Sequence, residues 1–268
     1  MRKCSLCWMI YFLVVLVFSG GGKILADEFQ PDEHTLFLCH YNTSLDADYA
    51  KGDPRGMGKA NLTSGGNGYF GEGLVASKKY KGEIQGLVPG FKGLSYDISK
   101  NLNLDEGTLE MWVNLLVDLE KMKGTRRVLF RYRYVQQKKV KQQVILYIGE
   151  NLKLIFYESK GGDNWASQAC AGTINWKKGE WHHIAVTWSK KKGEKALFVD
   201  GVLQQKGPFR GLPEFSQVFP RMCIGSGTEG GIWALEGIID EFRISDIVRY
   251  TDDFILPERD TTHTNTGK

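Results

Sequence analysis

Cysteine, long apolar runs and an excess of charge of one sign are all scarce in this chain of 268 residues. Of its five cysteines, Cys4 and Cys7 fall in an N-terminal segment, which leaves Cys39, Cys170 and Cys223 for the rest. Three cysteines cannot all pair, and no cluster has the close spacing of a zinc site. The pattern is compatible with one disulfide and one buried thiol, and equally with three small buried apolar residues.

The N-terminal apolar run, residues 8–18, is only eleven residues long, whereas a membrane-spanning helix needs about 20. Two basic residues precede it, and small residues followed by Ile-Leu-Ala come after it, which is typical of a secretory signal. We predict that residues 1–26 are a signal peptide, that nothing inserts into a membrane after its cleavage, and that the protein is secreted, cell-surface or periplasmic. An uncleaved N-terminal anchor is the less favoured alternative.

The formal net charge of +4 comes largely from that segment, which holds three of the 35 Lys and Arg residues and no acidic residue. The remaining 32 basic side chains face 31 acidic ones. A nearly neutral protein has no global electrostatic attraction for nucleic acid or for an anionic membrane. We therefore expect neither as a partner.

Signatures of catalysis are missing as well. The sequence has no Gly-x-Ser-x-Gly, His-Glu-x-x-His or phosphate-loop motif. Glu110, His182 and His183 are the remaining candidates, but adjacent histidines on a strand point to opposite faces and cannot act as a pair at one site. We interpret all three as sheet residues and expect that the protein is not an enzyme.

The strongest pattern in the chain is a hairpin over residues 181–201. Residues 181–188 alternate, so that Ile184, Val186 and Trp188 share an apolar face. A polar run with a glycine follows, and then a second alternating run ends in Asp200-Gly201, a tight-turn signal. These features predict two paired strands at the centre of the fold.

Short strand-like runs make up most of the remaining sequence, with polar or glycine-containing turns between them and no alternating helices. They cover residues 35–41, 108–116, 126–135, 144–149, 152–158, 167–173, 222–225 and 237–245. This pattern predicts an all-β protein with an antiparallel two-sheet jelly-roll sandwich. We assign one domain to residues 27–256 and a polar C-terminal tail to residues 257–268.

Four stretches, taken in order, carry a resemblance to a known family. They are residues 107–113 (GTLEMWV), 181–188 (WHHIAVTW), 197–201 (LFVDG), and 224–226 (IGS) followed by 237–245 (GIIDEFRIS). Over about residues 35–254 the chain resembles the laminin G-like jelly-roll domains of the concanavalin A-like lectin and glucanase superfamily. The resemblance implies two antiparallel sheets packed face to face and a concave face that holds sugars in some relatives. It also implies adjacent first and last strands, which would place Cys39 near the strand of Asp240.

The resemblance also implies a structural calcium ion. Asp240 lies in an otherwise apolar strand, where an unpaired carboxylate is costly, and in many relatives the matching Asp helps to hold calcium against the loop after the first strand. Calcium takes six to eight oxygen ligands, and here Asp240, Asp46 and Asn42 are the expected side-chain ligands, with Asp48 nearby. Asn42 stands where bacterial relatives often have Asp, which removes one charge. The alternative is that Asp240 pairs with an arginine such as Arg243 or accepts hydrogen bonds from backbone amides.

Hydrolysis of a glycan is disfavoured within the same superfamily. Its retaining glucanases carry Glu-x-Asp-x-x-Glu on one strand, which places two carboxylates on one face, and this chain lacks the motif. The nearest match, Asp240-Glu241, is adjacent in sequence and is predicted to point to opposite faces of the sheet.

Sugar binding is the remaining specific hypothesis. Sugar sites place aromatic rings against the apolar faces of the sugar, beside hydrogen-bonding groups. Trp165 lies in a polar loop with Asp163 and Asn164, and Tyr157 precedes that loop; we predict these four as ligand contacts. A loop tryptophan that covers the sandwich edge is the competing interpretation of Trp165.

The sequence therefore predicts a secreted, lectin-like module whose partner is a glycan, with calcium as its cofactor. An extracellular protein-binding adhesion or structural module is the alternative, and a glycan hydrolase or lyase is less favoured.

Between residues 126 and 135, Tyr132 and Tyr134 share one face, interpreted as core, and Arg131 and Arg133 share the other.

Overall fold

The computed structural model describes residues 25–78, 91–136, 139–160, 170–211 and 221–259. The chain divides into two units. In the smaller one, residues 1–26 and 257–268, strand β1 (Leu25–Ala26) pairs in parallel with β18 (Glu258–Arg259). The larger unit, residues 27–256, contains the strands described below. No helix in the described ranges is long and apolar enough to cross a membrane.

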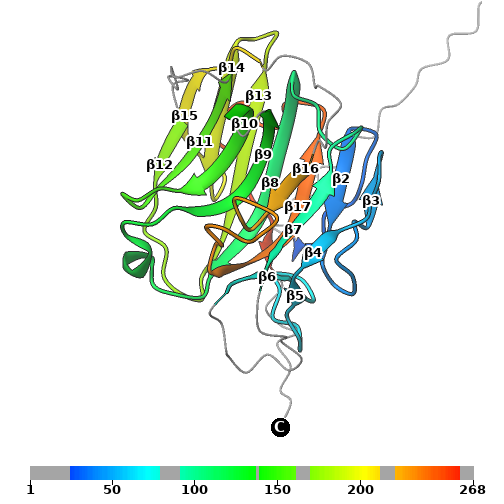
Figure 1. The fold of residues 1–268 in the computed structure, drawn as a ribbon, viewed down its shortest axis with the longest axis vertical. Helices are drawn as coiled ribbons and strands as arrows, with labels where there is room; N and C mark the ends of the chain where they lie inside the picture. Colours follow the sequence, from blue (N-terminus) through cyan, green and yellow to red (C-terminus); the bar gives the residue numbers. More distant parts are fainter. Residues whose placement is uncertain (1–24, 79–90, 137–138, 161–169, 212–220, 260–268) are drawn as a thin grey trace, which may run out of the picture. The chain divides into compact units, whose positions relative to one another are not determined.

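One sheet of the larger unit has seven strands among the described residues, all paired in antiparallel fashion (Figure 1). In spatial order they are β12 (Cys170–Thr173), β11 (Lys153–Lys160), β10 (Lys139–Ile148), β9 (Arg127–Gln136), β16 (Arg221–Ile224), β7 (Gly93–Asp97) and β4 (Met57–Lys59).

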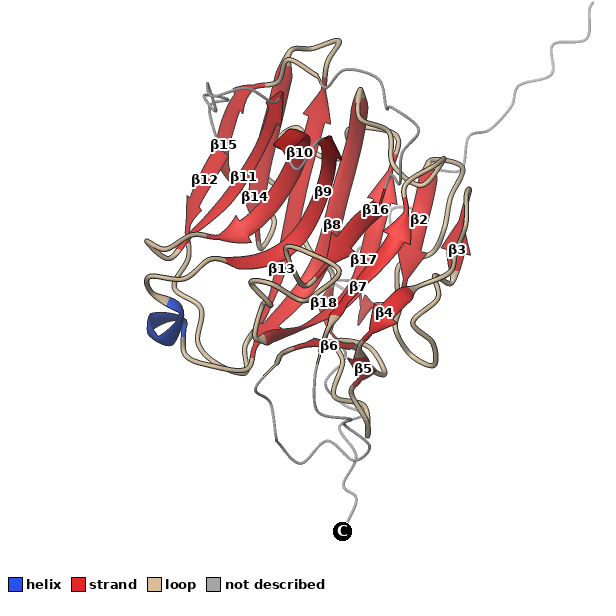
Figure 2. Cartoon of the chain, in the orientation of Figure 1, coloured by secondary structure: helices blue, strands red, loops and turns tan. Residues whose placement is uncertain are grey.

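The second sheet of this unit has nine strands within the same described ranges. Its main path is β15 (Val202–Pro208), β14 (Glu194–Val199), β13 (Trp181–Ser189), β8 (Glu106–Leu115), β17 (Gly237–Ser245), β2 (Thr35–Cys39) and β3 (Tyr49–Ala50). The short strands β5 (Asn61–Leu62) and β6 (Leu74–Ala76) complete it, with β6 paired to β17. Strands dominate Figure 2, where the single helical turn described is η1 (Leu119–Met122). The predicted all-β jelly-roll sandwich is confirmed.

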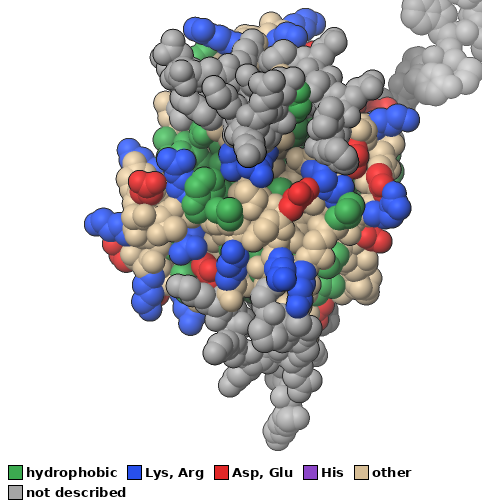
Figure 3. All heavy atoms as spheres, in the orientation of Figure 1, with side chains coloured by type: hydrophobic (Ala, Val, Ile, Leu, Met, Phe, Trp, Pro, Cys, Tyr) green, Lys and Arg blue, Asp and Glu red, His purple; other side chains and the backbone are tan. Residues whose placement is uncertain are grey.

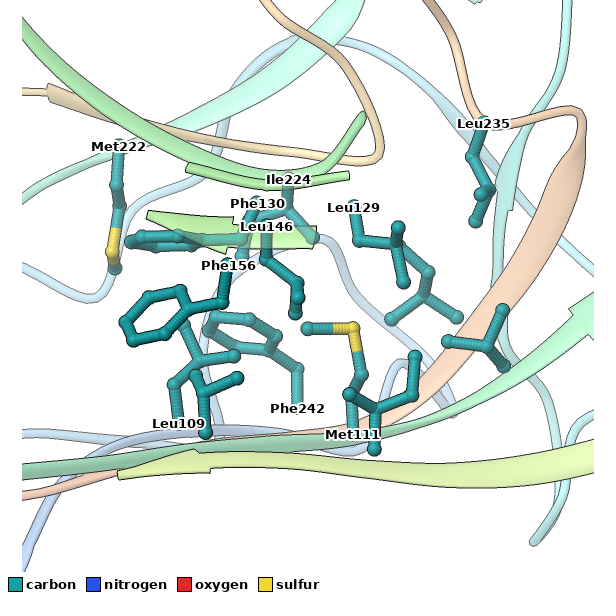
Figure 4. Packing of buried hydrophobic residues seen from close by; sticks show 14 of the residues in the cluster. Leu109, Met111, Leu129, Phe130, Leu146, Phe156, Met222, Ile224, Leu235 and Phe242 are labelled. Carbon is teal, nitrogen blue, oxygen red and sulfur yellow. The ribbon is translucent and has the colours of Figure 1, made fainter. Parts of the chain in front are cut away.

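The hydrophobic core lies between the two sheets (Figure 4). Because side chains alternate along a strand, Leu109 and Met111 of β8 point inward from one sheet, and Phe130 and Leu146 point inward from the other. Phe242 of β17 stacks on Phe130, with ring centroids 6.1 Å apart. Burial of these apolar surfaces is the main force that holds the sheets together.

The predicted central hairpin is present. Strand β13 pairs with β14 with Thr187 opposite Ala196, and Ile184, Val186 and Trp188 belong to the core. The sequence also predicts that Trp112, Trp181 and Trp188 belong to the core. This holds for Trp188, but Trp112 and Trp181 lie on the outer face of the nine-stranded sheet.

There, Trp112 stacks on Tyr69 at a centroid distance of 3.6 Å, and Trp181 packs edge-on to the same ring at 5.7 Å. The outer face of the nine-stranded sheet is thus itself covered by chain segments. Residues 27–34 place Phe29 over the Arg243 guanidinium, 4.1 Å from its carbon, and residues 246–256 stack Tyr250 on Phe254. Ligand access to this sheet is therefore restricted from its outer side.

The three cysteines outside the N-terminal segment are free and buried. The interpretation as buried apolar residues is confirmed over a disulfide. Cys39 lies opposite Phe242 in the β2–β17 ladder, which confirms that the first long strand and the strand of Asp240 are neighbours.

Candidate ligand-binding face

The outer face of the seven-stranded sheet presents a row of side chains from three neighbouring strands. Ile145 of β10 lies opposite Arg131 of β9 on one side and opposite Tyr157 of β11 on the other. Gln143 and Tyr147 lie two residues to either side of Ile145 and share its face, because the side-chain period of a strand is two. We call these five residues, together with Trp233, the aromatic–amide face.

Hydrogen bonds join three members of this face across the strands. Gln143 Oε1 accepts from Arg131 Nε at 3.1 Å and from Arg131 Nη2 at 2.7 Å, while Gln143 Nε2 donates to the Tyr157 hydroxyl at 2.6 Å. Burial raises the pKa of Tyr157, so its phenol is neutral at physiological pH. These bonds hold the amide and the phenol in fixed orientations.

Trp233 reaches the same face from the loop that follows β16. Its carbonyl accepts a hydrogen bond from Val128 N at 2.9 Å, which ties the loop to β9. The indole lies 5.6 Å from the guanidinium carbon of Arg131 and 5.7 Å from that of Arg126, within the range of cation–π contacts. Arg126 also lies 5.8 Å from the Tyr147 ring.

Trp233 is 37 % exposed and its neighbour Ile232 is 50 % exposed. Figure 3 views the unit from this side and shows hydrophobic side chains gathered where β9 to β12 lie, bordered by Lys and Arg. Trp233 is not among the ligand contacts predicted from the sequence. The available signal was a tryptophan in a glycine-rich loop, the same signal that singled out Trp165.

The predicted ligand contacts have different outcomes. Tyr157 lies on the aromatic–amide face, with Tyr147 packed edge-on at 6.0 Å. Trp165, Asn164 and Asp163 lie outside the described residues, so their role stays a prediction.

The predicted calcium ligands are only partly brought together. The carboxylate of Asp240 is fully buried and accepts hydrogen bonds from the main-chain N–H groups of Tyr69 (2.7 Å), Phe70 (2.9 Å) and Glu241 (2.8 Å). Burial, with a smaller contribution from Glu241, raises the pKa of Asp240 to about 8. The alternative partner Arg243 binds Glu110 instead.

Asn42 contacts the same loop as Asp240, because its Oδ1 accepts from Glu72 N at 2.9 Å. Asp46 does not contact it: its carboxylate accepts from Gly56 N at 2.8 Å. Among the described residues, no group of three His, Cys, Asp or Glu side chains is arranged to hold a metal ion. The side chains alone therefore do not form a complete calcium site, and calcium stays a prediction.

The former catalytic candidates have separate surroundings. Glu110 is fully buried, with Oε1 bound by Arg243 (Nη2 at 2.8 Å) and Oε2 bound by the Tyr250 hydroxyl at 2.8 Å. His183 Nε2 lies 3.3 Å from Glu110 Oε2, whereas His182 contacts Asp200 at 2.8 Å on the other face. As predicted, the two histidines do not form a pair.

A β-bulge overturns the prediction that Asp240 and Glu241 point to opposite faces. The β17–β8 register shifts between Asp240 and Arg243, and Glu241 has φ +50°. The extra residue leaves both carboxylates outside the core: Asp240 binds the loop around Tyr69, and Glu241 binds His40 Nδ1 at 2.7 Å and Phe29 N at 2.5 Å. Each carboxylate has its own partners, and both are fully buried.

The two packed antiparallel sheets define a jelly-roll β-sandwich. A profile of the concanavalin A-like lectin/glucanases superfamily, Laminin_G_3, matches residues 93–253. The chain therefore belongs to the concanavalin A-like lectin/glucanases superfamily. No curated protein sequence matches it.

Solved structures share the fold at low sequence identity. Domain 4 of AbnA, a GH43 extracellular arabinanase from Geobacillus stearothermophilus solved in complex with arabinotriose, is 16% identical with a TM-score of 0.53, covering 80% of this chain and 94% of that one. The binding domain of Paraclostridial Mosquitocidal Protein 1 is 11% identical with a TM-score of 0.53, covering 81% of this chain and 50% of that one. At these identities the likeness shows the fold alone.

Proposed function

We propose that this protein is a carbohydrate-binding module that holds a saccharide on the aromatic–amide face. The observation that carries the proposal is the Arg131–Gln143–Tyr157 hydrogen-bonded row, flanked by the rings of Tyr147 and Trp233. The buried Gln143 amide fixes the half-buried Tyr157 phenol, whose hydroxyl supplies an oriented hydrogen bond. Aromatic rings cover the apolar faces of sugar rings. Preorganised side chains also lose little entropy on binding.

The comparisons support a binding role rather than catalysis. The arabinanase domain was solved with arabinotriose, and the mosquitocidal neighbour is a binding domain. In this chain both oxygens of the buried Glu110 carboxylate are bonded, to Arg243 and to Tyr250. Glu110 is therefore not placed to donate a proton to a substrate.

The test is saccharide binding by the full chain, first on an array of neutral, carboxylated and sulfated oligosaccharides and then by calorimetry with the best binder. Tyr147→Ala should lower the affinity about tenfold, which corresponds to about 1.4 kcal/mol. Tyr49→Ala, a half-buried tyrosine of the nine-stranded sheet, is the matched control and should bind like the wild type. No binding to any saccharide, by a chain with a cooperative unfolding transition, would reject the proposal.

We infer that a calcium ion, where bound, stabilises the fold through Asp240, Asn42 and main-chain carbonyls of the loop around Tyr69, without Asp46. Anything that binds only the folded state raises the unfolding midpoint by mass action. We therefore expect calcium to raise the midpoint relative to chelator in the wild type, and to leave it unchanged in Asp240→Ala. Equal wild-type midpoints in calcium and in chelator would reject this inference.

Export is proposed on the composition of residues 1–26 alone. Cleavage before Asp27 should give a mature protein whose N-terminal sequence begins Asp-Glu-Phe. Sequencing of the N-terminus of exported protein tests it, and an intact Met1 in that protein would favour the uncleaved anchor.

A further inference from the structure

Two guanidinium groups on the outer face of the seven-stranded sheet have no carboxylate partner within the described part of the chain. Arg131 and Arg133 are two residues apart on β9 and share that face. Arg131 is 8% exposed, and Arg133 is half-buried. Among the residues that the structure describes, neither has a carboxylate within ion-pair distance.

The hydrogen bonds of Arg131 all end on neutral acceptors. Its partners are the Gln143 amide oxygen and the Gly227 carbonyl, at 3.1 Å. A guanidinium has five N–H groups, and three of these bonds leave two N–H groups for another acceptor. The positive charge itself is therefore not neutralised by these contacts.

The neighbouring arginines differ in this respect. Arg126 lies 3.4 Å from Glu150, and Arg221 lies 3.2 Å from Glu229. With both of those charges paired, Arg131 and Arg133 give the face a local surplus of positive charge although the protein as a whole is nearly neutral.

Burial of a charge without a partner is unfavourable. Burial, and then repulsion from Arg133, lower the pKa of Arg131, which reflects the same cost. An anion at this position would offset that cost. The planar guanidinium can donate two parallel hydrogen bonds to two oxygens of a carboxylate or of a sulfate group.

We propose that the ligand of the aromatic–amide face is an acidic saccharide whose carboxylate or sulfate group pairs with Arg133 and Arg131. This inference rests on the proposed carbohydrate binding and names the class of sugar. Tyr147 and Trp233 contact the sugar rings, and the Tyr157 hydroxyl, oriented by the buried Gln143, binds a sugar hydroxyl. The two arginines select for the negative charge.

The array described above separates this inference from the proposed function. Preferential binding to carboxylated or sulfated members supports both, and the member bound shows which anionic group is recognised. Binding to neutral members with equal or higher affinity would overturn the acidic-ligand inference and leave carbohydrate binding supported. Binding to none would overturn both.

Variants then test the arginines by calorimetry with the best acidic binder and with a neutral oligosaccharide of the same backbone. Arg133→Gln should lower the affinity for the acidic ligand at least about tenfold and leave the neutral one unchanged. Arg133→Lys should restore part of the affinity, because the charge returns without the planar fork. Wild-type affinity for the acidic ligand should fall as salt rises from about 50 to about 200 mM, because salt screens charge pairs.

Arg55→Gln is the matched control. It removes the same charge from an exposed loop, where Arg55 Nη2 binds Asp53 at 2.6 Å, and it should keep the wild-type preference. The unfolding midpoint of Arg133→Gln should equal or exceed that of the wild type, since Arg133 forms no ion pair with any residue that the structure describes. An unchanged acidic preference in Arg133→Gln would overturn the assignment of this residue.

Discussion

At the scale of single residues, the Glu110 carboxylate is buried beneath the segments that cover the nine-stranded sheet. Both of its oxygens are bound, one by Arg243 and one by Tyr250. Removal of one partner of a buried ion pair leaves the other charge uncompensated. Arg243 would lose this carboxylate and keep its ring contact with Phe29.

Glu110→Ala should therefore lower the free energy of unfolding by about 3 kcal/mol or more, measured by urea denaturation. Glu120→Ala, which removes an exposed carboxylate on η1, should change it by less than about 0.5 kcal/mol. Similar effects of the two substitutions would show that the buried pair contributes little.

The same residue predicts a pH dependence. Burial alone would raise the pKa of Glu110, but the Arg243 charge and the other partners outweigh it and lower the pKa from 4.5 to about 2. A lowered carboxyl pKa means stability that is complete above the unfolded-state value and is lost as pH falls toward the folded-state value. The difference in unfolding free energy between the wild type and Glu110→Gln should shrink between pH 4.5 and about 2. A constant difference across that range would contradict the prediction.

At the scale of strands and loops, residue alternation predicted the elements well and their long-range partners poorly. The period-two pattern gave β8, β13, β14 and β17 and the inward faces of β9 and β13. It could not give the bulge at Glu241, whose left-handed backbone is held by contacts with His40 and Phe29, about 200 residues away in the chain.

The candidate site was predictable to a similar extent. Tyr157 was predicted as a ligand contact from its position before a polar loop. The shared face of Arg131 and Arg133 was predicted from alternation. The hydrogen bonds from Arg131 to Gln143 depend on the register of β9 against β10, which includes two irregularities, and alternation does not specify register. The sequence predicted Trp112 in the core, whereas it points outward and is covered by Tyr69. Alternation cannot show that a distant loop will cover an outward side chain.

The loop that carries Trp233 begins at Gly225, which gives a prediction at this scale. Gly225 has φ +69°, and a Cβ there would lie 2.4 Å from the Ala76 Cβ. Gly225→Ala should destabilise the fold by more than about 2 kcal/mol, since an overpacked core adds to the cost of a left-handed backbone.

Gly124→Ala is the control for backbone strain without a clash. Gly124 has φ +75°, and a Cβ there has nothing within 4 Å, so only about 1–2 kcal/mol should be lost. Thermal and urea unfolding of both variants measure the difference. Equal losses would mean that the core around Ala76 adjusts freely.

At the scale of the whole molecule, the three buried thiols report on the integrity of the sandwich. Burial raises the pKa of Cys170 to about 11 and that of Cys223 to about 12, and the thiolate is the reactive form. Cys39, Cys170 and Cys223 should resist alkylation in the folded protein and react fully in denaturant, as measured by mass spectrometry of peptides.

A reductant should leave the unfolding midpoint unchanged, because no disulfide joins these three residues. A midpoint that falls in reductant, or a thiol that denaturant fails to expose, would contradict the assignment of three free cysteines.

Strand β17 lies in the middle of the nine-stranded sheet, between β8 and β2, yet it is the last long strand along the sequence. A polypeptide leaving the ribosome therefore cannot complete this sheet until residues 237–245 have emerged, and its earlier strands wait with apolar surface exposed. Contacts that close such long stretches of chain also form slowly. The order of strands therefore delays completion of the nine-stranded sheet until the last long strand has been synthesised, which a sequence of local hairpins would not.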